Sequence, residues 1–274
     1  MAFDTNHLID LPPISVKLSF TMRSGGQYEG TGFCVEHQGR IWLVTCRHNV
    51  EDREYDFTGA NDLISMSLGG GSVLAFDATR SVVAISVDGF VPDCAAIELR
   101  PGEWGDTPRF STATAMWTKN VKLPDTINVQ APPPSTQAAK LQPTGWVLFQ
   151  GFPGGAMTPT TLRGVRVVPL PWRIRSWMPT FLPACVEGFS GGPVLDMTDE
   201  TMTLLGITTH RFPAQFQVNV DEGRRAEVQI EASIAAPLAP LLWALERAPP
   251  GVSVIPVRSA QVGAGSANPR PAAP

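Results

Sequence analysis

The feature that most constrains the fold of this chain is a series of short strand-like segments, each closed by turn residues. In residues 14–22, apolar and polar side chains alternate with a period of two, which is the pattern of a strand with one buried face. Residues 32–37 and 40–45 form two further runs, and Gln38-Gly39 between them predicts a hairpin. The first part of the chain is therefore expected to be antiparallel β-structure.

The same pattern extends over most of the chain. Further strand-like runs lie at residues 63–68, 72–76, 82–87, 94–99, 145–150, 162–168, 173–177, 203–208 and 227–232. A single stretch, residues 238–247, has the pattern of a helix, and Pro249-Pro250 ends it. Short strands, frequent turns and little helical periodicity predict an all-β fold, either a sandwich or a barrel.

The length of 274 residues allows one large core or two smaller ones. The strand pattern loosens between residues 101 and 140, where Pro132-Pro133-Pro134 marks a loop. We therefore expect a first β-domain at residues 13–105 and a second at residues 106–248, which ends with the helix. Residues 249–274 are rich in proline, alanine and glycine and are predicted to be a flexible tail.

Composition and charge argue against several classes of function. The net charge is −4 and no long basic cluster is present, so no nucleic-acid partner is expected. No apolar run approaches the roughly 18 residues of a membrane helix, so no membrane association is expected. Residues 1–12 have neither a basic start nor an apolar run and do not resemble a secretory signal. These features predict a soluble, cytoplasmic protein.

The four cysteines, Cys34, Cys46, Cys94 and Cys185, form no CxxC pair, so neither a zinc site nor a redox dithiol is predicted. Each lies in or beside an apolar stretch, which is typical of buried, reduced thiols. Cys34 and Cys46 flank one hairpin. Whether they form a disulfide is open, because the sequence does not give the distance between them.

The most informative stretch is Gly188-Phe189-Ser190-Gly191-Gly192-Pro193-Val194. A serine hydroxyl is a weak nucleophile at neutral pH and needs a neighbouring base and a site for the oxyanion that it creates. Small flanking residues let backbone amides converge on that oxyanion. Ser190 is therefore a candidate nucleophile, and the amides of Gly188 and Ser190 are candidate oxyanion donors. A glycine-rich hairpin with an incidental serine is the alternative interpretation.

The base for this serine should be one of the four histidines. His48 directly follows the apolar run at residues 40–45, and the end of a strand holds a side chain rigidly, as a base requires. A histidine in this position could instead cap the strand through a backbone hydrogen bond.

Asp93 is the best placed carboxylate to orient that histidine. It opens the buried-looking run at residues 94–99, where it would need a hydrogen-bond donor such as imidazole Nδ1–H. Asp88 is followed by Gly89 and is instead typical of an exposed turn. Asp93 could also simply be the first residue of a strand.

Together these residues resemble the chymotrypsin/trypsin-like serine peptidases, in particular bacterial members without structural disulfides. The order His48, Asp93, Ser190 is that of this family, whereas subtilisins and α/β-hydrolases use other orders. The local strings agree, and they are Gly30-Thr31-Gly32-Phe33, Leu43-Val44-Thr45-Cys46-Arg47-His48, Asp93-Cys94-Ala95-Ala96-Ile97, Gly151-Phe152-Pro153-Gly154-Gly155 and Gly188-Phe189-Ser190-Gly191-Gly192-Pro193. The resemblance spans residues 14–247.

This resemblance implies two six-stranded β-barrels with the active site in the cleft between them. His48 and Asp93 would belong to the first barrel and Ser190 to the second. It also implies peptide hydrolysis through an acyl-enzyme, in which His48 takes the serine proton and returns it to the leaving amine while Asp93 stays ionised. Neither a metal nor another cofactor is needed, and the expected partner is a protein or peptide substrate.

The family's specificity pocket would have Ala184 at its base and Thr208, Thr209 and His210 on its far wall. An uncharged base argues against a basic P1 residue and favours a small or medium uncharged one. Arg211 stands where many relatives have a glycine that pairs with the substrate backbone, which departs from the usual substrate geometry.

A second departure concerns activation. Secreted digestive members have an aspartate directly before the nucleophile, which pairs with a newly cleaved N-terminus. This chain has Phe189 at that position, so no zymogen switch of that kind is expected. With no partner-binding domain evident in the sequence, we expect activity to depend on a regulatory partner protein or on a very narrow substrate.

Two other functions are compatible with parts of the sequence. A serine esterase of α/β-hydrolase type would share Gly188-x-Ser190-x-Gly192, but it needs a helix after the serine, and Pro193-Val194-Leu195-Asp196 enters a turn. A catalytically degenerate peptidase domain could act as a binding module, with Arg211 or residues 101–140 obstructing the cleft.

Overall fold

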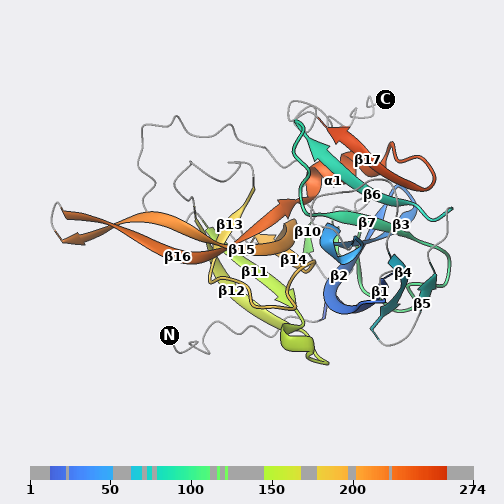
Figure 1. The fold of residues 1–274 in the computed structure, drawn as a ribbon, viewed down its shortest axis with the longest axis horizontal. Helices are drawn as coiled ribbons and strands as arrows, with labels where there is room; N and C mark the ends of the chain where they lie inside the picture. Colours follow the sequence, from blue (N-terminus) through green and yellow to red (C-terminus); the bar gives the residue numbers. More distant parts are fainter. Residues whose placement is uncertain are drawn as a thin grey trace, which may run out of the picture.

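A computed structural model describes residues 13–22, 25–51, 63–69, 73–75, 79–111, 116–117, 121–122, 145–167, 178–196, 202–221 and 224–257. These residues form β-strands, one α-helix and two short 3-10 turns. The strands gather into two bodies, one built around β1 to β7 and the other around β11 to β16 (Figure 1). The all-β fold predicted from the sequence is confirmed. No helix in the described part of the chain is both long and apolar enough to cross a membrane.

The first body is a half-barrel sheet. Its strands follow the order β5-β4-β1-β2-β3-β7-β6. In chain order they are β1 (Val16–Met22), β2 (Gln27–His37), β3 (Arg40–Thr45), β4 (Leu63–Leu68), β5 (Val73–Ala75), β6 (Val82–Val87) and β7 (Ala95–Leu99).

Apolar and polar side chains alternate along β1, and this alternation gives the sheet a buried inner face. Leu18, Phe20 and Met22 of β1 are buried, whereas Ser19 is exposed. The buried residues pack with Ile97 of β7 in one hydrophobic cluster. Burial of each such side chain contributes about 1.5–3 kcal/mol. A slip by one residue would turn them all to solvent, so this face fixes the register of β1.

The second body is a closed six-stranded barrel. The pairings run in a ring, β11-β12-β13-β16-β15-β14 and back to β11. Phe149, Phe181 and Phe189 pack together in one cluster of buried residues. The strands are β11 (Gly145–Gly151), β12 (Thr160–Val167), β13 (Thr180–Leu182), β14 (Pro193–Asp196), β15 (Met202–Asp221) and β16 (Arg224–Pro237).

Three short strands connect the two bodies. β8 (Arg109–Ser111) pairs with β2, β9 (Met116–Trp117) pairs with β8 and with β10 (Val121–Lys122), and β10 pairs with β15. β8 lies beyond the domain boundary predicted at residue 105 and yet pairs with the first sheet. The domain limits at residues 13–105 and 106–248 otherwise stay a prediction.

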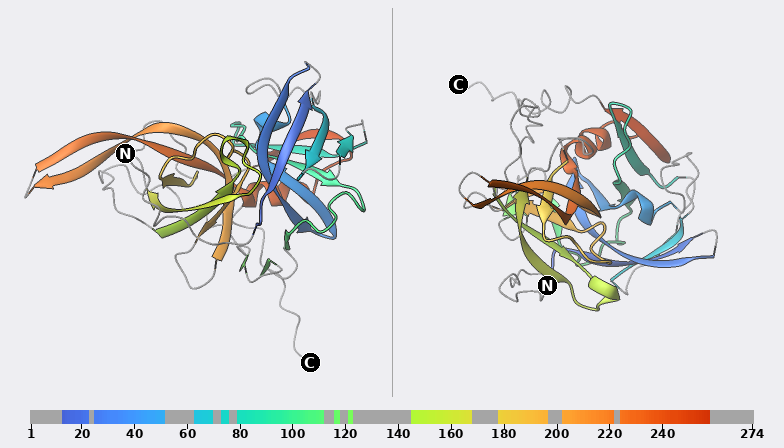
Figure 2. Two further views of the ribbon diagram at one scale, coloured as in Figure 1. Left: turned by 90° about the horizontal axis from the view of Figure 1, so that it is seen from below. Right: turned by 60° about the vertical axis from the view of Figure 1, so that its left-hand side comes forward.

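β15 and β16 continue beyond the barrel as a two-stranded ribbon. Their register runs from Arg211↔Ser233 to Asp221↔Arg224, and the ribbon projects away from both bodies (Figures 1 and 2). The sequence predicted only residues 203–208 and 227–232 as strands here. Pro213 and the polar residues around it are typical of a loop, but proline is tolerated in an edge strand.

The last described residues correct one expectation. α1 (Leu238–Leu245) forms as predicted, and its buried side chains join the same hydrophobic cluster as residues of β6. The flexible tail predicted from residue 249 is wrong at its start, because β17 (Val252–Val257) pairs in parallel with β6. Pro256 obscured this strand in the sequence. Residues 258–274 and the predicted strand at 173–177 lie outside the described residues.

Deleting residues 252–274 should destabilise the fold, because it removes β17 and the buried Val257 and leaves one edge of β6 unpaired. Deleting residues 258–274 keeps the strand and is the matched control. Burial of one large apolar side chain contributes about 1.5–3 kcal/mol, and each kcal/mol shifts Tm by about 2–4 °C in a chain of this size. We expect the longer deletion to have a Tm about 3–12 °C below the control by circular dichroism. Equal Tm values would contradict a structural role for β17.

Candidate active site

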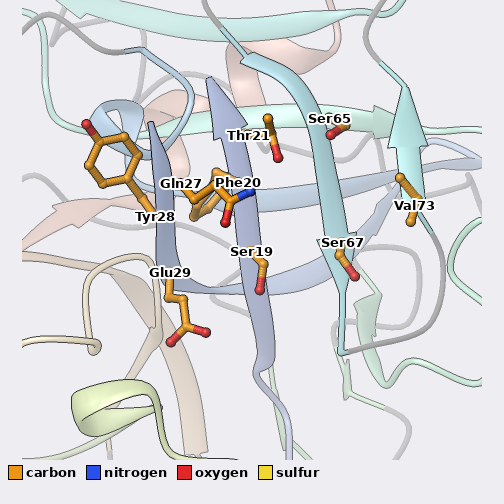
Figure 3. A pocket seen from close by; sticks show the side chains of 9 residues that line it. All are labelled: Ser19, Phe20, Thr21, Gln27, Tyr28, Glu29, Ser65, Ser67 and Val73. Carbon is orange, nitrogen blue, oxygen red and sulfur yellow. The ribbon is translucent and has the colours of Figure 1, made fainter. Parts of the chain in front are cut away.

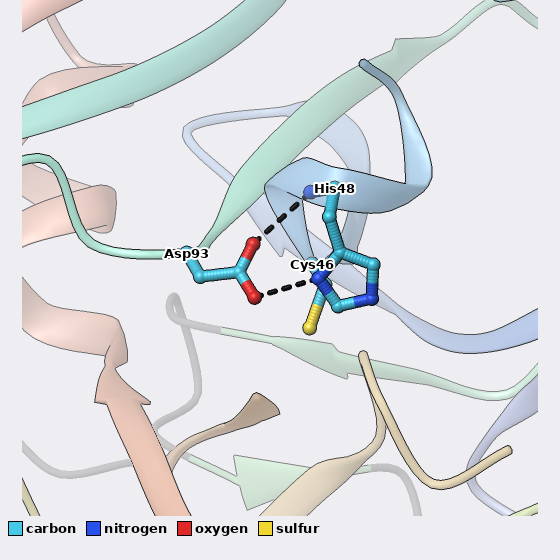
Figure 4. Close-up of side chains that lie close together, drawn as sticks. All are labelled: Cys46, His48 and Asp93. Atoms are coloured by element: carbon cyan, nitrogen blue, oxygen red, sulfur yellow. Dashed lines mark hydrogen bonds and ion pairs between the residues drawn. The ribbon is translucent and has the colours of Figure 1, made fainter. Parts of the chain in front are cut away.

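His48 and Asp93 lie side by side in the first body. His48 is in the 3-10 turn η2 (Arg47–Asn49) after β3, and Asp93 is two residues before β7. His48 Nδ1 lies 2.7 Å from Asp93 Oδ2, and the backbone N–H of His48 donates to Asp93 Oδ1 at 3.0 Å (Figure 4). One carboxylate thus holds both the ring and the backbone of the histidine.

Asp93 is a largely buried carboxylate, with 13% of its side chain exposed. Burial by itself raises the pKa of Asp93, but the hydrogen bonds and charge of His48 and the charge of His210 together hold that pKa below its ordinary value. Asp93 is therefore ionised at neutral pH. The other candidate, Asp88, is exposed and lies in a turn at φ 49°, as its sequence context predicted.

The turn that carries Ser190 is bonded to β2 next to His48. The carbonyl of Ser190 accepts a hydrogen bond from Thr31 N–H at 3.0 Å and one from the side-chain amide of Asn49 at 3.5 Å. The Thr31 hydroxyl donates to the carbonyl of Gly188 at 2.5 Å. Because Asn49 directly follows His48, these bonds join the serine of the second body to the histidine turn of the first.

Two glycines are required by this close approach. Gly191 has a φ of +94°, and a Cβ atom there would lie 1.9 Å from the carbonyl oxygen of Thr31. Gly188 has the same φ, and its Cβ would lie 2.1 Å from the carbonyl oxygen of Phe152. Any side chain at either position would push the turn away from the strands that hold it.

The Ser190 hydroxyl donates to the carbonyl of Thr209 at 2.8 Å. Because a hydroxyl has a single proton, rotation about one side-chain bond is needed to present that proton to an imidazole. β14 begins three residues after Ser190, so the helix that an α/β-hydrolase requires at this point is not formed. Within the described part of the chain, no hydrogen bond from the amides of Gly188 or Ser190 is found, and their role as oxyanion donors stays a prediction.

An apolar side chain anchors the nucleophile turn. Phe189 is fully buried, and its ring centroid lies 5.7 Å from that of Phe149. Two residues before it, the carbonyl of Glu187 accepts a hydrogen bond from Gly154 N–H at 3.1 Å. Gly154 belongs to the 3-10 turn η3 (Pro153–Gly155). Packing of Phe189 and backbone hydrogen bonds therefore hold the nucleophile turn in place.

The predicted specificity residues occupy different environments. Thr208 and Thr209 are buried in β15, where the Thr208 carbonyl accepts from Gly191 N–H at 2.7 Å and the Thr209 hydroxyl donates to the carbonyl of Ile234 at 3.1 Å. Ala184 is half-buried ahead of the nucleophile turn. The substrate-binding role of these positions stays a prediction.

His210, predicted on the pocket wall, lies beside the carboxylate of Asp93. Its Nδ1 is 4.0 Å from Asp93 Oδ2, and its side chain is 47% exposed. Arg211 is also exposed and lies 3.8 Å from Glu231 of β16. His210 thus lies beside the candidate triad, whereas Arg211 and Glu231 form an exposed ion pair between β15 and β16.

Cys46, His48 and Asp93 form the one group of possible metal ligands among the described residues, with ligand atoms within 4.8 Å of one another. The Cys46 thiol donates to the Thr208 carbonyl at 3.1 Å, and burial raises its pKa. A metal needs the thiolate, which this setting disfavours. All four cysteines are buried and free, so Cys34 and Cys46 are not paired and the prediction of reduced thiols is confirmed.

Sequence reasoning missed Thr31 and Asn49, which bond the nucleophile turn, and Thr45, which holds both of them within the first body. Thr45 donates its hydroxyl to the Thr31 carbonyl at 2.7 Å, and the Asn49 amide donates to the Thr45 hydroxyl at 2.9 Å. Their one signal was position, with Thr31 between two glycines and Asn49 beside His48. Nothing local indicates that such residues bond a turn on another domain.

Known proteins share this architecture. A family model described as a trypsin-like peptidase domain matches residues 30–207. The protease Anisep from Arthrobacter nicotinovorans is 11% identical, with 84% of this chain and 92% of that chain covered and a TM-score of 0.50. At this identity the likeness concerns the fold alone.

Two further solved structures match with lower TM-scores. The thermostable serine protease AL20 from an extremophilic microorganism is 13% identical, with 93% of this chain and 98% of that chain covered and a TM-score of 0.47. The HtrA-type protease AlgW with a tripeptide is 16% identical, with 86% and 61% covered and a TM-score of 0.46. No curated protein sequence gives a significant match.

The lowered pKa of Asp93 predicts a pH-dependent contribution to stability. The contribution is fully present above the ordinary aspartate pKa of about 3.9 and is lost as the pH falls through the lowered folded-state pKa. We expect wild type to exceed Asp93→Asn in free energy of unfolding at about pH 7, and the difference to shrink below about pH 4. Urea unfolding of both proteins across this range measures it, and a difference independent of pH would contradict the linkage.

Proposed function

The chain belongs to the trypsin-like peptidase family, and on this premise we propose that it is a serine endopeptidase with Ser190 as nucleophile, His48 as general base and Asp93 as orienting carboxylate. The observation that carries the proposal is the pair of hydrogen bonds from Thr31 and Asn49 to the Ser190 carbonyl. They join the nucleophile turn to the residue that follows a histidine already held by a carboxylate. A serine, a base and its orienting group are the parts that acyl transfer requires.

In the proposed reaction, the Ser190 hydroxyl turns from Thr209 towards His48. Its proton passes to Nε2 while Oγ forms a bond to the carbonyl carbon of the substrate, and the π electrons of the carbonyl move to its oxygen. The amides of Gly188 and Ser190 donate to this oxyanion. The C–N bond then breaks, and the amine leaves with the proton from Nε2. In the second half of the reaction, water gives a proton to His48 Nε2 while its oxygen attacks the acyl carbonyl. The bond to Ser190 Oγ then breaks, Oγ takes the proton from Nε2, and the carboxylic acid product leaves.

Asp93 supports this proton transfer without taking the proton. Its hydrogen bond to Nδ1, at 2.7 Å, favours the tautomer in which Nε2 is free to accept. Its charge stabilises the imidazolium that forms, and its lowered pKa keeps that charge in place at neutral pH. The steps require neither a metal nor another cofactor.

An activated Ser190 should react with a fluorophosphonate probe. We expect intact-mass spectrometry to find one adduct on the folded wild type and none on Ser190→Ala. Ser86→Ala, a serine change in β6 of the first body, is the matched control and should label as wild type does. Absence of labelling on the folded wild type would contradict the peptidase proposal and favour a catalytically degenerate binding module.

Asp93→Asn should lower kcat by up to about 10⁴ while leaving the fold intact, on the pattern of chymotrypsin-type triads, because the asparagine amide favours the wrong imidazole tautomer. Asp88→Asn makes the same change in an exposed turn and should keep the wild-type rate. Turnover of a cleaved reporter peptide measures both. If Asp93→Asn kept full activity, the orienting role would pass to another carboxylate.

A further inference from the structure

A groove of about 480 Å³ crosses the outer face of the half-barrel sheet (Figure 3). The register of β1 with β4 sets four hydroxyl side chains in two facing pairs, Ser19 with Ser67 and Thr21 with Ser65. Short side chains leave the centre of the face low, while residues of β2 and β5 stand on either side. The groove is lined by Ser19, Phe20, Thr21, Gln27, Tyr28, Glu29, Ser65, Ser67 and Val73.

The lining offers hydrogen bonds with little net charge. Hydroxyl groups both donate and accept, so the floor can bind backbone amides and carbonyls alike. The one carboxylate of the lining, Glu29, is paired with Lys17 Nζ at 2.9 Å. Val73, which is 69% exposed, adds apolar contact on the β5 side. This surface suits an uncharged polar chain.

β2 connects the groove to the nucleophile turn. The N–H of Thr31 bonds the Ser190 carbonyl and so faces away from β1. Because backbone groups alternate along a strand, those of Glu29 and Gln27 face the same way. Among the described residues, no strand pairs with this edge of β2 between Gln27 and Gly30. An open strand edge therefore leads from the nucleophile, and four residues at about 3.3 Å each reach the groove about 13 Å away.

A second connection runs from Glu29 to the oxyanion donors. Lys17 bonds Glu29 and also donates to the Gly155 carbonyl of η3 at 2.7 Å. The same turn donates an N–H to the carbonyl of Glu187, the residue before Gly188. Figure 3 shows η3, in yellow-green, beside Glu29 at the end of the groove. Lys17 and η3 thus link Glu29, at the edge of the groove, to the residue before a candidate oxyanion amide.

We propose that this groove binds the part of a polypeptide substrate that follows the scissile bond, from about the fourth residue onward. The inference rests on the proposed peptidase function and names the substrate class, a long chain with uncharged polar residues on its leaving-group side. The chain leaves the nucleophile along the open edge of β2 and crosses the hydroxyl floor. Binding of the substrate in the groove lowers KM through the added contacts, and it raises kcat through the link from Glu29 by Lys17 to η3.

The test uses peptides with one fixed sequence before the scissile bond, taken from cleavage of a random library by the full chain. Two, four or eight residues of serine, glycine and asparagine follow that bond. We expect kcat/KM of the wild type to rise roughly tenfold, equivalent to about 1.4 kcal/mol, between the peptides with four and eight following residues. Both kcat and KM should contribute to the rise.

Ser67→Tyr fills the floor of the groove and should abolish this gain while cleaving the shortest peptide at the wild-type rate. Gln229→Tyr adds the same side chain at an exposed strand position of the ribbon and should keep the gain. Lys17→Met should lose the kcat part of the gain and keep the KM part.

Thr21→Glu provides a second, independent variant. It places an unpaired negative charge on the floor and should shift preference towards long peptides with lysine after the fourth position. Cleavage of the shortest peptide confirms that each variant is folded.

The outcomes separate this site from the peptidase function. Equal kcat/KM values for the peptides with four and eight following residues, or an undiminished gain in Ser67→Tyr, would overturn the groove site while Ser190 labelling and short-peptide cleavage continue. Loss of both labelling and cleavage in the folded wild type would overturn the peptidase function and this substrate site with it.

Discussion

The bonds between Thr31 and the nucleophile turn are the constraint on which the rest of the site depends. Thr31 donates from its N–H to Ser190 and from its hydroxyl to Gly188, and its carbonyl accepts from Thr45. Each such bond contributes about 0.5–1.5 kcal/mol, but a buried group left without a partner costs about 1–3 kcal/mol. Moving the turn away from β2 would break several bonds together. The glycine at 191 is a consequence, since only a residue without Cβ permits this approach.

Further hydrogen bonds join the two bodies just before β1 and within it. Gln150 of β11 accepts through Oε1 from the N–H groups of Ile14 and Ser15 and from the Ser15 hydroxyl, at 2.8, 2.9 and 2.6 Å. Further along, Lys17 reaches the turn after β11. β1 and the two residues before it are therefore bonded to β11 and η3 of the other body. The apolar anchor and these bonds together support the nucleophile turn.

Most strands could be predicted because their signals are local. A period of two marks β1, and Gln38-Gly39 marks the hairpin after β2. Predictions were incomplete where a strand depends on a distant partner. β17 is stabilised by β6, and the outer half of β15 by β16, so their sequences alone resemble a tail and a loop. The contact of His210 with Asp93 likewise had no local signal, because it forms only when β15 and the loop before β7 pack together.

By itself the sequence determined where many of the strands lie, which serine stands in a glycine-rich turn, and which histidine and aspartate were available to it. These follow from dihedral preferences and side-chain alternation, which act over a few residues. The tertiary structure decided that Asp93 accepts hydrogen bonds from both the ring and the backbone of His48. It also decided that Thr31 and Asn49 bond the serine turn, and that Lys17 links a hydroxyl-lined groove to η3. Each of these joins residues from different strands and turns, and packing of the two bodies selects them because no local pattern encodes a contact between distant segments.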